Sequence, residues 1–242
     1  TKEHWIYKRF FEDAGVNPGY NGMKGNVTYI HSDYRDNIKN LDPVFVQEVQ
    51  ELATKNPNKY EHQILGGWLD KAEGVIFTNW EQGEFKEVSI PVYGQDFGFS
   101  IDPTTLVKTS IDKKNKIIYA KELLYKPKLT TSEIYDHNSV SAGDSLIYAD
   151  SAEPRLISEL KSKGCNIRQT VKGQGSITAG ISLLQDYKLI VEGANIVREL
   201  NNYIWHDKKS NVPIDDYNHI IDAIRYAIYP QLSKKVLDFY AG

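Results

Sequence analysis

The chain has 242 residues, of which 40% are hydrophobic and 25% are charged, and its formal net charge is −3. This balance is typical of one large globular domain, or of one domain with an additional segment, and it excludes an intrinsically disordered chain. No run of about 18 apolar residues occurs, so no membrane-spanning helix is expected, and the first residues lack the apolar core of a secretion signal. The single cysteine, Cys165, excludes an internal disulfide and a cysteine-rich zinc site.

The first part of the chain, up to about residue 88, has the pattern of a mostly helical or irregular connector. Helices are predicted over residues 3–14 and 43–55, and the one legible strand lies at 25–31. Asparagine next to proline or glycine marks turns between these elements. From residue 89 to residue 242 the pattern becomes regular, so we expect a domain boundary after residue 88.

The regular part begins with three predicted strands, at residues 91–100, 105–111 and 116–125, of which the last two form a hairpin. Helices and strands then alternate. Helices are predicted over 131–138, 153–163, 177–186, 195–205 and 217–229, the last ending at Pro230, and strands over 145–149, 166–171 and 188–191. This order predicts an α/β fold with a mixed β-sheet flanked by helices. It is the order of ribonuclease-H-like folds, although periodicity alone does not separate these from other α/β folds.

Lysine is enriched between residues 106 and 130. The lysines of this strip are Lys108, Lys113, Lys114, Lys116, Lys121, Lys126 and Lys128, opposed only by Asp112 and Glu122. The negative net charge argues against a protein that coats DNA, but a basic strip suits an enzyme that contacts phosphates on one face. The alternative is a solvated hairpin whose lysines protect an edge strand.

Two aspartates lie in or directly after predicted strands. Asp96 is near the middle of the first regular strand, where aspartate is disfavoured; the alternative is an acid in a bulge or turn beside Gly94 and Gly98. Asp150 follows the short strand that ends at residue 149, and the carboxyl ends of strands are where α/β sheets usually bind ligands. Its alternative role is to cap the next helix, as Asp150 or its neighbour Ser151 would do.

A third aspartate, Asp222, lies on the last predicted helix beside a stripe of isoleucines. His219, three residues earlier, projects from the same face of that helix. The alternative for Asp222 is an ion pair with Arg225, worth only a few tenths of a kcal/mol. Glu153 is either a secondary ligand or an ordinary acid in the first turn of a helix.

Asp96, Asp150 and Asp222 together predict a metal site. Carboxylate oxygens are the preferred ligands of Mg²⁺ and Mn²⁺. Two such ions about 4 Å apart can orient an attacking water and stabilise the leaving oxygen of a phosphodiester. A lone carboxylate cannot do this, so the hypothesis depends on the three acids converging.

Five segments of the regular part resemble, in the same order, segments of the nuclease domain of phage terminase large subunits. The first, at 94–103, reads GQDFGFSIDP, and the second, at 147–154, reads IYADSAEP. The other three are residues 172–181, 199–205 and 218–227. The resemblance implies a ribonuclease-H-like nuclease that cuts concatemeric viral double-stranded DNA during genome packaging.

The resemblance also implies roles for individual residues. Asp96, Asp150 and Asp222 would be the ligands of two Mg²⁺ or Mn²⁺ ions, and His219 would be an auxiliary ligand or a proton carrier. Lys172 would contact phosphate or the metal-bound water; its alternative is a solvated loop lysine. The implied partners are DNA, a portal protein and a small terminase subunit, with no membrane, and the implied location is the cytoplasm of an infected or lysogenic bacterium.

The N-terminal part is similar to the same family. Residues 65–68 and 74–77 resemble the junction at the end of its packaging ATPase, so residues 1–88 are interpreted as a remnant of that region. No Gly-x-x-x-x-Gly-Lys-Ser/Thr loop occurs in the 242 residues, so we expect no ATPase activity from this chain. Two alternatives stay open: a ribonuclease-H-like nuclease of the resolvase or transposase type, and a non-catalytic module that grips DNA or docks on the portal.

Overall fold

The computed structural model describes residues 1–72, 74–170, 175–206, 209 and 211–233. The chain divides into two compact units, Thr1–Ala72 and Glu73–Gly242. This division lies earlier than the boundary expected after residue 88. The reason is that Val75 bridges Ile204 and a short strand, β3 (Trp80–Gln82), pairs with a strand of the second unit. The origin of the first unit as part of an ATPase region stays a prediction.

The first unit consists of short elements around an aromatic cluster. Its elements are α1 (Trp5–Tyr7) with the π-helical turn Lys8–Glu12, the hairpin of β1 (Gly22–Lys24) and β2 (Val27–Tyr29), the 3₁₀ segment Tyr34–Asn40, α2 (Pro43–Lys55), and α3 (Pro57–Lys59) with the π-helical turn Tyr60–Ile64. The α2 bounds agree with the prediction, because the Asp42 side chain accepts from the Val44 and Phe45 N–H groups at the start of this helix. Trp68 packs against Tyr7 and Phe11, with ring centroids 5.3 and 5.8 Å apart.

The second unit is built on a seven-stranded mixed sheet with the order β3-β9-β6-β5-β4-β7-β8. Its other strands are β4 (Val92–Asp96), β5 (Thr104–Asp112), β6 (Ile117–Lys126), β7 (Ile147–Ala149), β8 (Ile167–Gln169) and β9 (Lys188–Glu192). The three predicted meandering strands form the antiparallel group β4-β5-β6, and the strands outside this group pair in parallel. The expected mixed sheet is therefore confirmed, with β4 and β5 in its interior.

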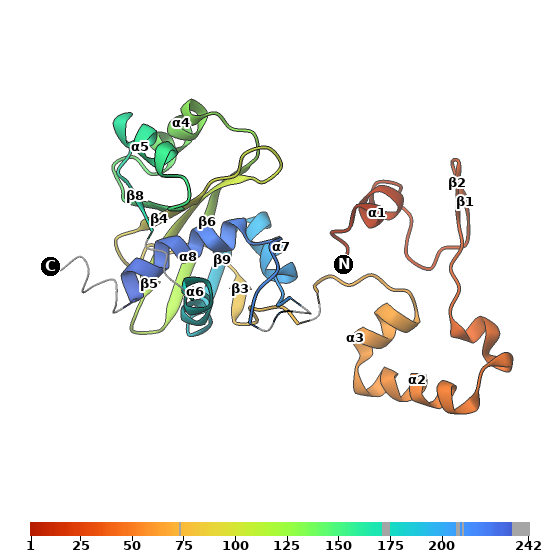
Figure 1. The fold of residues 1–242 in the computed structure, drawn as a ribbon. Coiled ribbons are helices and arrows are strands. Elements are labelled where there is room, and N and C mark those ends of the chain that lie inside the picture. The colour runs from red at the N-terminus through yellow and green to blue at the C-terminus, as the bar shows by residue number, and fades with distance from the viewer. Residues whose placement is uncertain (73, 171–174, 207–208, 210, 234–242) are drawn as a thin grey trace. The chain divides into compact units, whose positions relative to one another are not determined.

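Helices cover both faces of this sheet (Figure 1). They are α4 (Thr131–Ser141), α5 (Pro154–Ser162), α6 (Ser176–Gln185), α7 (Ala194–Asn202) and α8 (His219–Leu232). Apolar residues of α4 and α5 share one core with β4 and β7, and those of α6, α7 and α8 share a second core with β5, β6 and β9. Within the described ranges, no helix has the length and apolarity needed to cross a bilayer.

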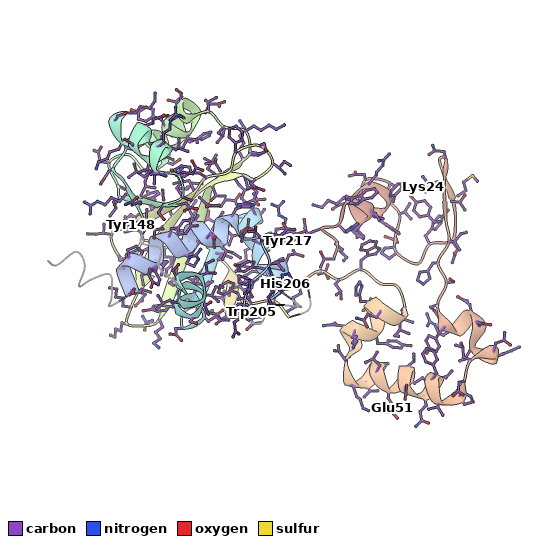
Figure 2. The ribbon with its side chains drawn as sticks, in the orientation of Figure 1. Lys24, Glu51, Tyr148, Trp205, His206 and Tyr217 are labelled. Carbon is purple, nitrogen blue, oxygen red and sulfur yellow. The ribbon has the colours of Figure 1, made fainter. Side chains whose placement is uncertain are left out.

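Two helix ends differ from the prediction. α8 does not end before Pro230 but continues to Leu232, because a proline removes only one N–H donor and Ser233 N–H still bonds to the Tyr229 carbonyl. α7 ends at Asn202 rather than at residue 205. The chain beyond it is extended, and Trp205, which is labelled in Figure 2, forms a β-bridge with Pro213 in the segment leading to α8.

Gly94 determines how closely α8 approaches the centre of the sheet. A Cβ atom at this position would lie 1.8 Å from the carbonyl oxygen of Ala223, so any other residue would push α8 away from β4. β4 itself pairs with β5 without a register shift; the irregularity lies between Leu106 and Val107 in the β5–β6 pairing. The interpretation of Asp96 as a bulge acid is therefore wrong. Gly94 instead marks a close helix–strand crossing.

Candidate functional site

Asp96 and Asp150 leave neighbouring parallel strands at the same edge of the sheet. Asp96 is the last residue of β4, and Asp150 follows the last residue of β7 directly. Gln95 pairs with Ala149 across these strands, and Asp150 N–H donates to the Gln95 carbonyl at 3.2 Å. This is the carboxyl end of two parallel strands, where α/β sheets usually place their ligands.

Asp150 does not cap the next helix. Its Oδ1 accepts from the Ala152 N–H at 2.8 Å, which is a local turn, while the N-cap of α5 is Glu153, whose side chain makes no capping bond. The alternative role as a cap, for Asp150 or Ser151, is therefore wrong. The side chain is held in place by this turn and by the Tyr226 hydroxyl, which donates to Asp150 Oδ2 at 3.3 Å.

The first turns of α8 bring His219 into contact with Asp96 and place Asp222 where its charge acts on Asp96. His219 Nδ1 lies 3.2 Å from Asp96 Oδ2. Burial raises the pKa of Asp96, the bond to His219 opposes this, and the negative charges of Asp222 and Asp150 raise it further. Asp96 is only 8% exposed. Asp222 and Asp150 therefore both act electrostatically on the buried Asp96 carboxylate, while a shared metal site stays a prediction.

Each of these acids also has a protein partner. Asp222 Oδ1 lies 2.9 Å from Arg225 Nη2, so the ion pair considered as an alternative is present as well. The bond to Asp96 raises the pKa of His219. Among the residues that the structure describes, no three His, Cys, Asp or Glu side chains are already arranged around one ion. The donor set of three carboxylates and an imidazole nevertheless suits a hard divalent cation. Ligation by Asp222 would compete with its pairing to Arg225.

Sequence reasoning missed Tyr226 as part of this site. Its hydroxyl is buried, and burial raises its pKa, with further contributions from Asp222, Asp96 and Asp150. All three acids therefore act on it electrostatically, and its hydroxyl donates a hydrogen bond to Asp150. Its position four residues after Asp222, on the same face of the helix, was the available signal.

Glu199 is a second residue that the sequence did not single out. It lies on α7 and is 0% exposed. Its Oε2 accepts from the N–H groups of Ile220 at 2.9 Å and Ile221 at 3.1 Å, and its Oε1 accepts from the Tyr125 hydroxyl at 2.9 Å. Asn218, the N-cap residue of α8, provides no side-chain capping bond. Glu199 thus caps the helix that carries His219 and Asp222.

The buried environment of Glu199 disfavours the ionised form of its carboxyl. Burial raises the pKa of its carboxyl to about 7. A glutamate at a helix position that should be apolar was the sequence signal, since Ile196 and Leu200 on the same stripe are buried.

The lysine strip is not an uninterrupted basic surface. Lys108 Nζ pairs with Glu87 at 2.7 Å and Lys121 Nζ pairs with Glu192 at 2.6 Å, two acids from outside the strip. The edge-strand explanation is wrong, because β5 and β6 both have neighbours on each side. Lys172, the predicted phosphate contact, lies outside the described residues.

Comparison with family models supports this architecture. Residues 96–229 match the model described as Terminase RNAseH like domain, and residues 1–67 match the one described as Phage terminase large subunit. The chain is 32% identical to the terminase large subunit of Bacillus phage SPP1 and 24% identical to the PBSX phage terminase large subunit of Bacillus subtilis (strain 168). These alignments cover 96% and 93% of this chain but only 57% and 58% of the relatives, so the chain spans little more than half of their length.

Solved structures give the same result. The nuclease domain of the SPP1 large terminase g2p, determined with bound Mn, matches with a TM-score of 0.59 and 31% identity, covering 65% of this chain and 99% of that one. The P22 large terminase nuclease domain matches at 0.56 with 16% identity, covering 69% of this chain and 97% of that one, which shows the fold alone. The expected ribonuclease-H-like fold is thus confirmed, and the chain belongs to the phage terminase large subunits, with residues 96–229 forming the RNase-H-like domain of that family.

Proposed function

We propose that this chain is a divalent-metal-dependent endonuclease that cleaves concatemeric viral double-stranded DNA during genome packaging. The observation that carries the proposal is the buried Asp96 carboxylate, in contact with His219 and within the electrostatic reach of Asp150 and Asp222. An acid with a raised pKa, such as Asp96, at the carboxyl end of parallel strands is typical of a functional site. The bound Mn of the SPP1 nuclease domain supports the same choice of metal.

Asp96, Asp150 and Asp222 are the residues that would hold Mg²⁺ or Mn²⁺, with His219 beside them. Two bound ions would supply an activated water and charge stabilisation at the leaving oxygen of the phosphodiester. The protein's own groups set up this chemistry. His219 Nδ1 fixes the orientation of Asp96, while its Nε2 lies 3.6 Å from Asp102 Oδ1, so the ring is held between two carboxylates. The Tyr226 hydroxyl holds Asp150.

Hydrolysis of supercoiled plasmid DNA tests this proposal. The purified chain should nick plasmid DNA in Mn²⁺ or Mg²⁺ and stop when EDTA is added. A chain that binds DNA but never cuts it, at any concentration of either metal, would favour the non-catalytic DNA-gripping module. A resolvase or transposase type would prefer branched or end-specific substrates over plain duplex, whereas a packaging nuclease should cut linear duplex at many positions.

Replacing Asp150 with asparagine should stop cleavage and slightly stabilise the protein without metal. The amide keeps the shape and can still accept from Ala152 N–H, but it removes one negative charge from the crowded site. The expected gain in melting temperature in EDTA is about 1–2 °C, which corresponds to roughly 0.5 kcal/mol for a domain of this size. The stabilisation by added Mn²⁺ should be smaller than in wild type. Melting curves with EDTA and with Mn²⁺ measure both effects.

Asp144→Asn is the matched control for this experiment. Asp144 is an exposed acid that precedes β7, whereas Asp150 follows it. The control variant should cut DNA and respond to Mn²⁺ as wild type does. Unchanged cleavage by Asp150→Asn would remove Asp150 from the metal site.

A further inference from the structure

The loop between β4 and β5 carries two large apolar side chains that stand in solvent. Phe99 is 89% exposed and Ile101 is 87% exposed. Leaving such a side chain in water forgoes the favourable free energy that its burial would release. Isolated exposed apolar residues are common, but these two lie on one short loop that begins directly after Asp96. Their position beside the candidate site points to a surface that is covered when the site is in use.

This loop is held in one conformation. The Thr104 hydroxyl donates to the Gly98 carbonyl at 3.0 Å, and Lys128 N–H donates to the Phe99 carbonyl at 3.2 Å. A Cβ atom at Gly98 would lie 2.0 Å from the Asp102 carbonyl oxygen, so the two sides of the loop are in close contact. Because Asp102 also faces His219, the tip of the loop is fixed relative to the site.

A groove of about 710 Å³ adjoins the loop and continues to the start of α5, just beyond Asp150. Its lining includes Phe99, Lys128, Leu129, Arg155 and Leu156. The Arg155 side chain is 91% exposed and pairs with Glu159 at 3.0 Å. Within the described part of the chain, Lys128 has no ion pair. The lining also includes two acids, Glu153 and Glu159, so Lys128 is the cation of this groove that is available to a phosphate. The groove adjoins the segments that follow Asp96 and Asp150.

We propose that the loop of residues 98–103 inserts Phe99 and Ile101 into the minor groove of the DNA next to the cleaved phosphodiester, while Lys128 contacts a phosphate. This inference rests on the proposed nuclease function and adds a binding surface to it. Proteins that bind the minor groove often insert apolar side chains such as Phe and Ile between base steps, and a nearby lysine can neutralise a phosphate. Two side chains are too small an apolar area for a stable protein partner, which requires about 800 Å² from each side.

The double variant Phe99→Ser/Ile101→Ser tests the proposal, with Val140→Ser as the matched control. Val140 is 90% exposed on α4 and does not line the groove. Fluorescence anisotropy with a labelled duplex in EDTA measures Kd over a range of salt concentrations. The double variant should bind about tenfold more weakly, with its melting temperature unchanged. The slope of log K against log salt should stay as in wild type, because no phosphate contact is removed.

Lys128→Ala should have the opposite effect on the salt dependence. Its slope of log K against log salt should be smaller in magnitude by roughly 0.9, because one phosphate contact is lost. Restoring an apolar side chain in Phe99→Leu/Ile101→Leu should recover most of the affinity. The proposal is overturned if the serine variant binds like Val140→Ser, or if its weaker binding comes with a reduced salt slope. Cleavage by wild type in Mn²⁺ is measured separately, so a failure of the loop proposal is distinguishable from a failure of the nuclease proposal.

Discussion

Replacing Asp96 with alanine is expected to lower Mn²⁺-dependent DNA cleavage by at least ~10³-fold while the fold stays intact. A lost metal ligand removes several kcal/mol of transition-state stabilisation, and about 1.4 kcal/mol corresponds to each factor of ten. The fold should persist because the ionised Asp96 carboxylate is disfavoured in the folded state. Burial raises its pKa, and the charges of Asp222 and Asp150 raise it further, so removing the acid removes an unfavourable charge. The rate of plasmid nicking and a melting curve in EDTA measure the two effects.

The control for this variant is Asp144→Ala, which removes an exposed carboxylate that precedes β7. It should cut DNA at the wild-type rate. The melting temperature of Asp96→Ala in EDTA should equal or exceed that of wild type. Near-normal cleavage by Asp96→Ala would show that the metal is held elsewhere, and a collapse in melting temperature would show a structural role for this acid instead.

The largest loss of stability is expected for Glu199→Ala. This change leaves the N–H groups of Ile220 and Ile221 and the hydroxyl of Tyr125 without their acceptor in a buried environment. Each unsatisfied buried group costs about 1–3 kcal/mol, so the free energy of unfolding should fall by roughly 3 kcal/mol or more. Urea denaturation measures it. Glu199→Gln should be far milder, because its amide oxygen can accept from both N–H groups and its amide nitrogen can donate to Tyr125.

The free energy of unfolding should also depend on pH through the Glu199 carboxyl. The pKa of Glu199 is raised by burial from 4.5 to about 7, so the folded state binds more protons than the unfolded state between these values. Its contribution to stability is therefore fully present below pH 4.5 and is lost as pH rises toward 7. The loss is on the order of 3 kcal/mol. Glu199→Gln should lack this part of the decline, so equal slopes for wild type and variant would contradict the assignment.

Local sequence patterns were sufficient for most of the architecture. The Asp42 cap and the following proline determined the start of α2, and the isoleucine stripe of α8 at Ile221, Ile224 and Ile228 is buried as predicted. The three predicted acids interact electrostatically because two of them end adjacent parallel strands, a relation that the order of strands and helices implies. Their assignment as metal ligands stays a prediction.

The remaining features depend on contacts between residues far apart in the chain. Gly94 resembled a bulge residue in the local sequence. Glycine is needed there because the backbone of Ala223, far along the chain, packs against it. Glu199 caps a helix that starts some twenty residues later, and no local motif encodes that pairing. Pro230 did not end α8, since a loss of one bond near the end of a helix is outweighed by burial of its apolar face.

The crossing of α8 over β4 also determines when the site can form during synthesis. The glycine face of β4 stays open until residues 219–232 have been made, and until then Asp96 has neither His219 nor Asp222 beside it. At about 5–20 residues per second, a ribosome needs on the order of ten seconds to travel from the first acid to the end of that helix. A nascent chain therefore carries the central strands of the sheet before the candidate site can assemble, so the site forms only after α8 has been made.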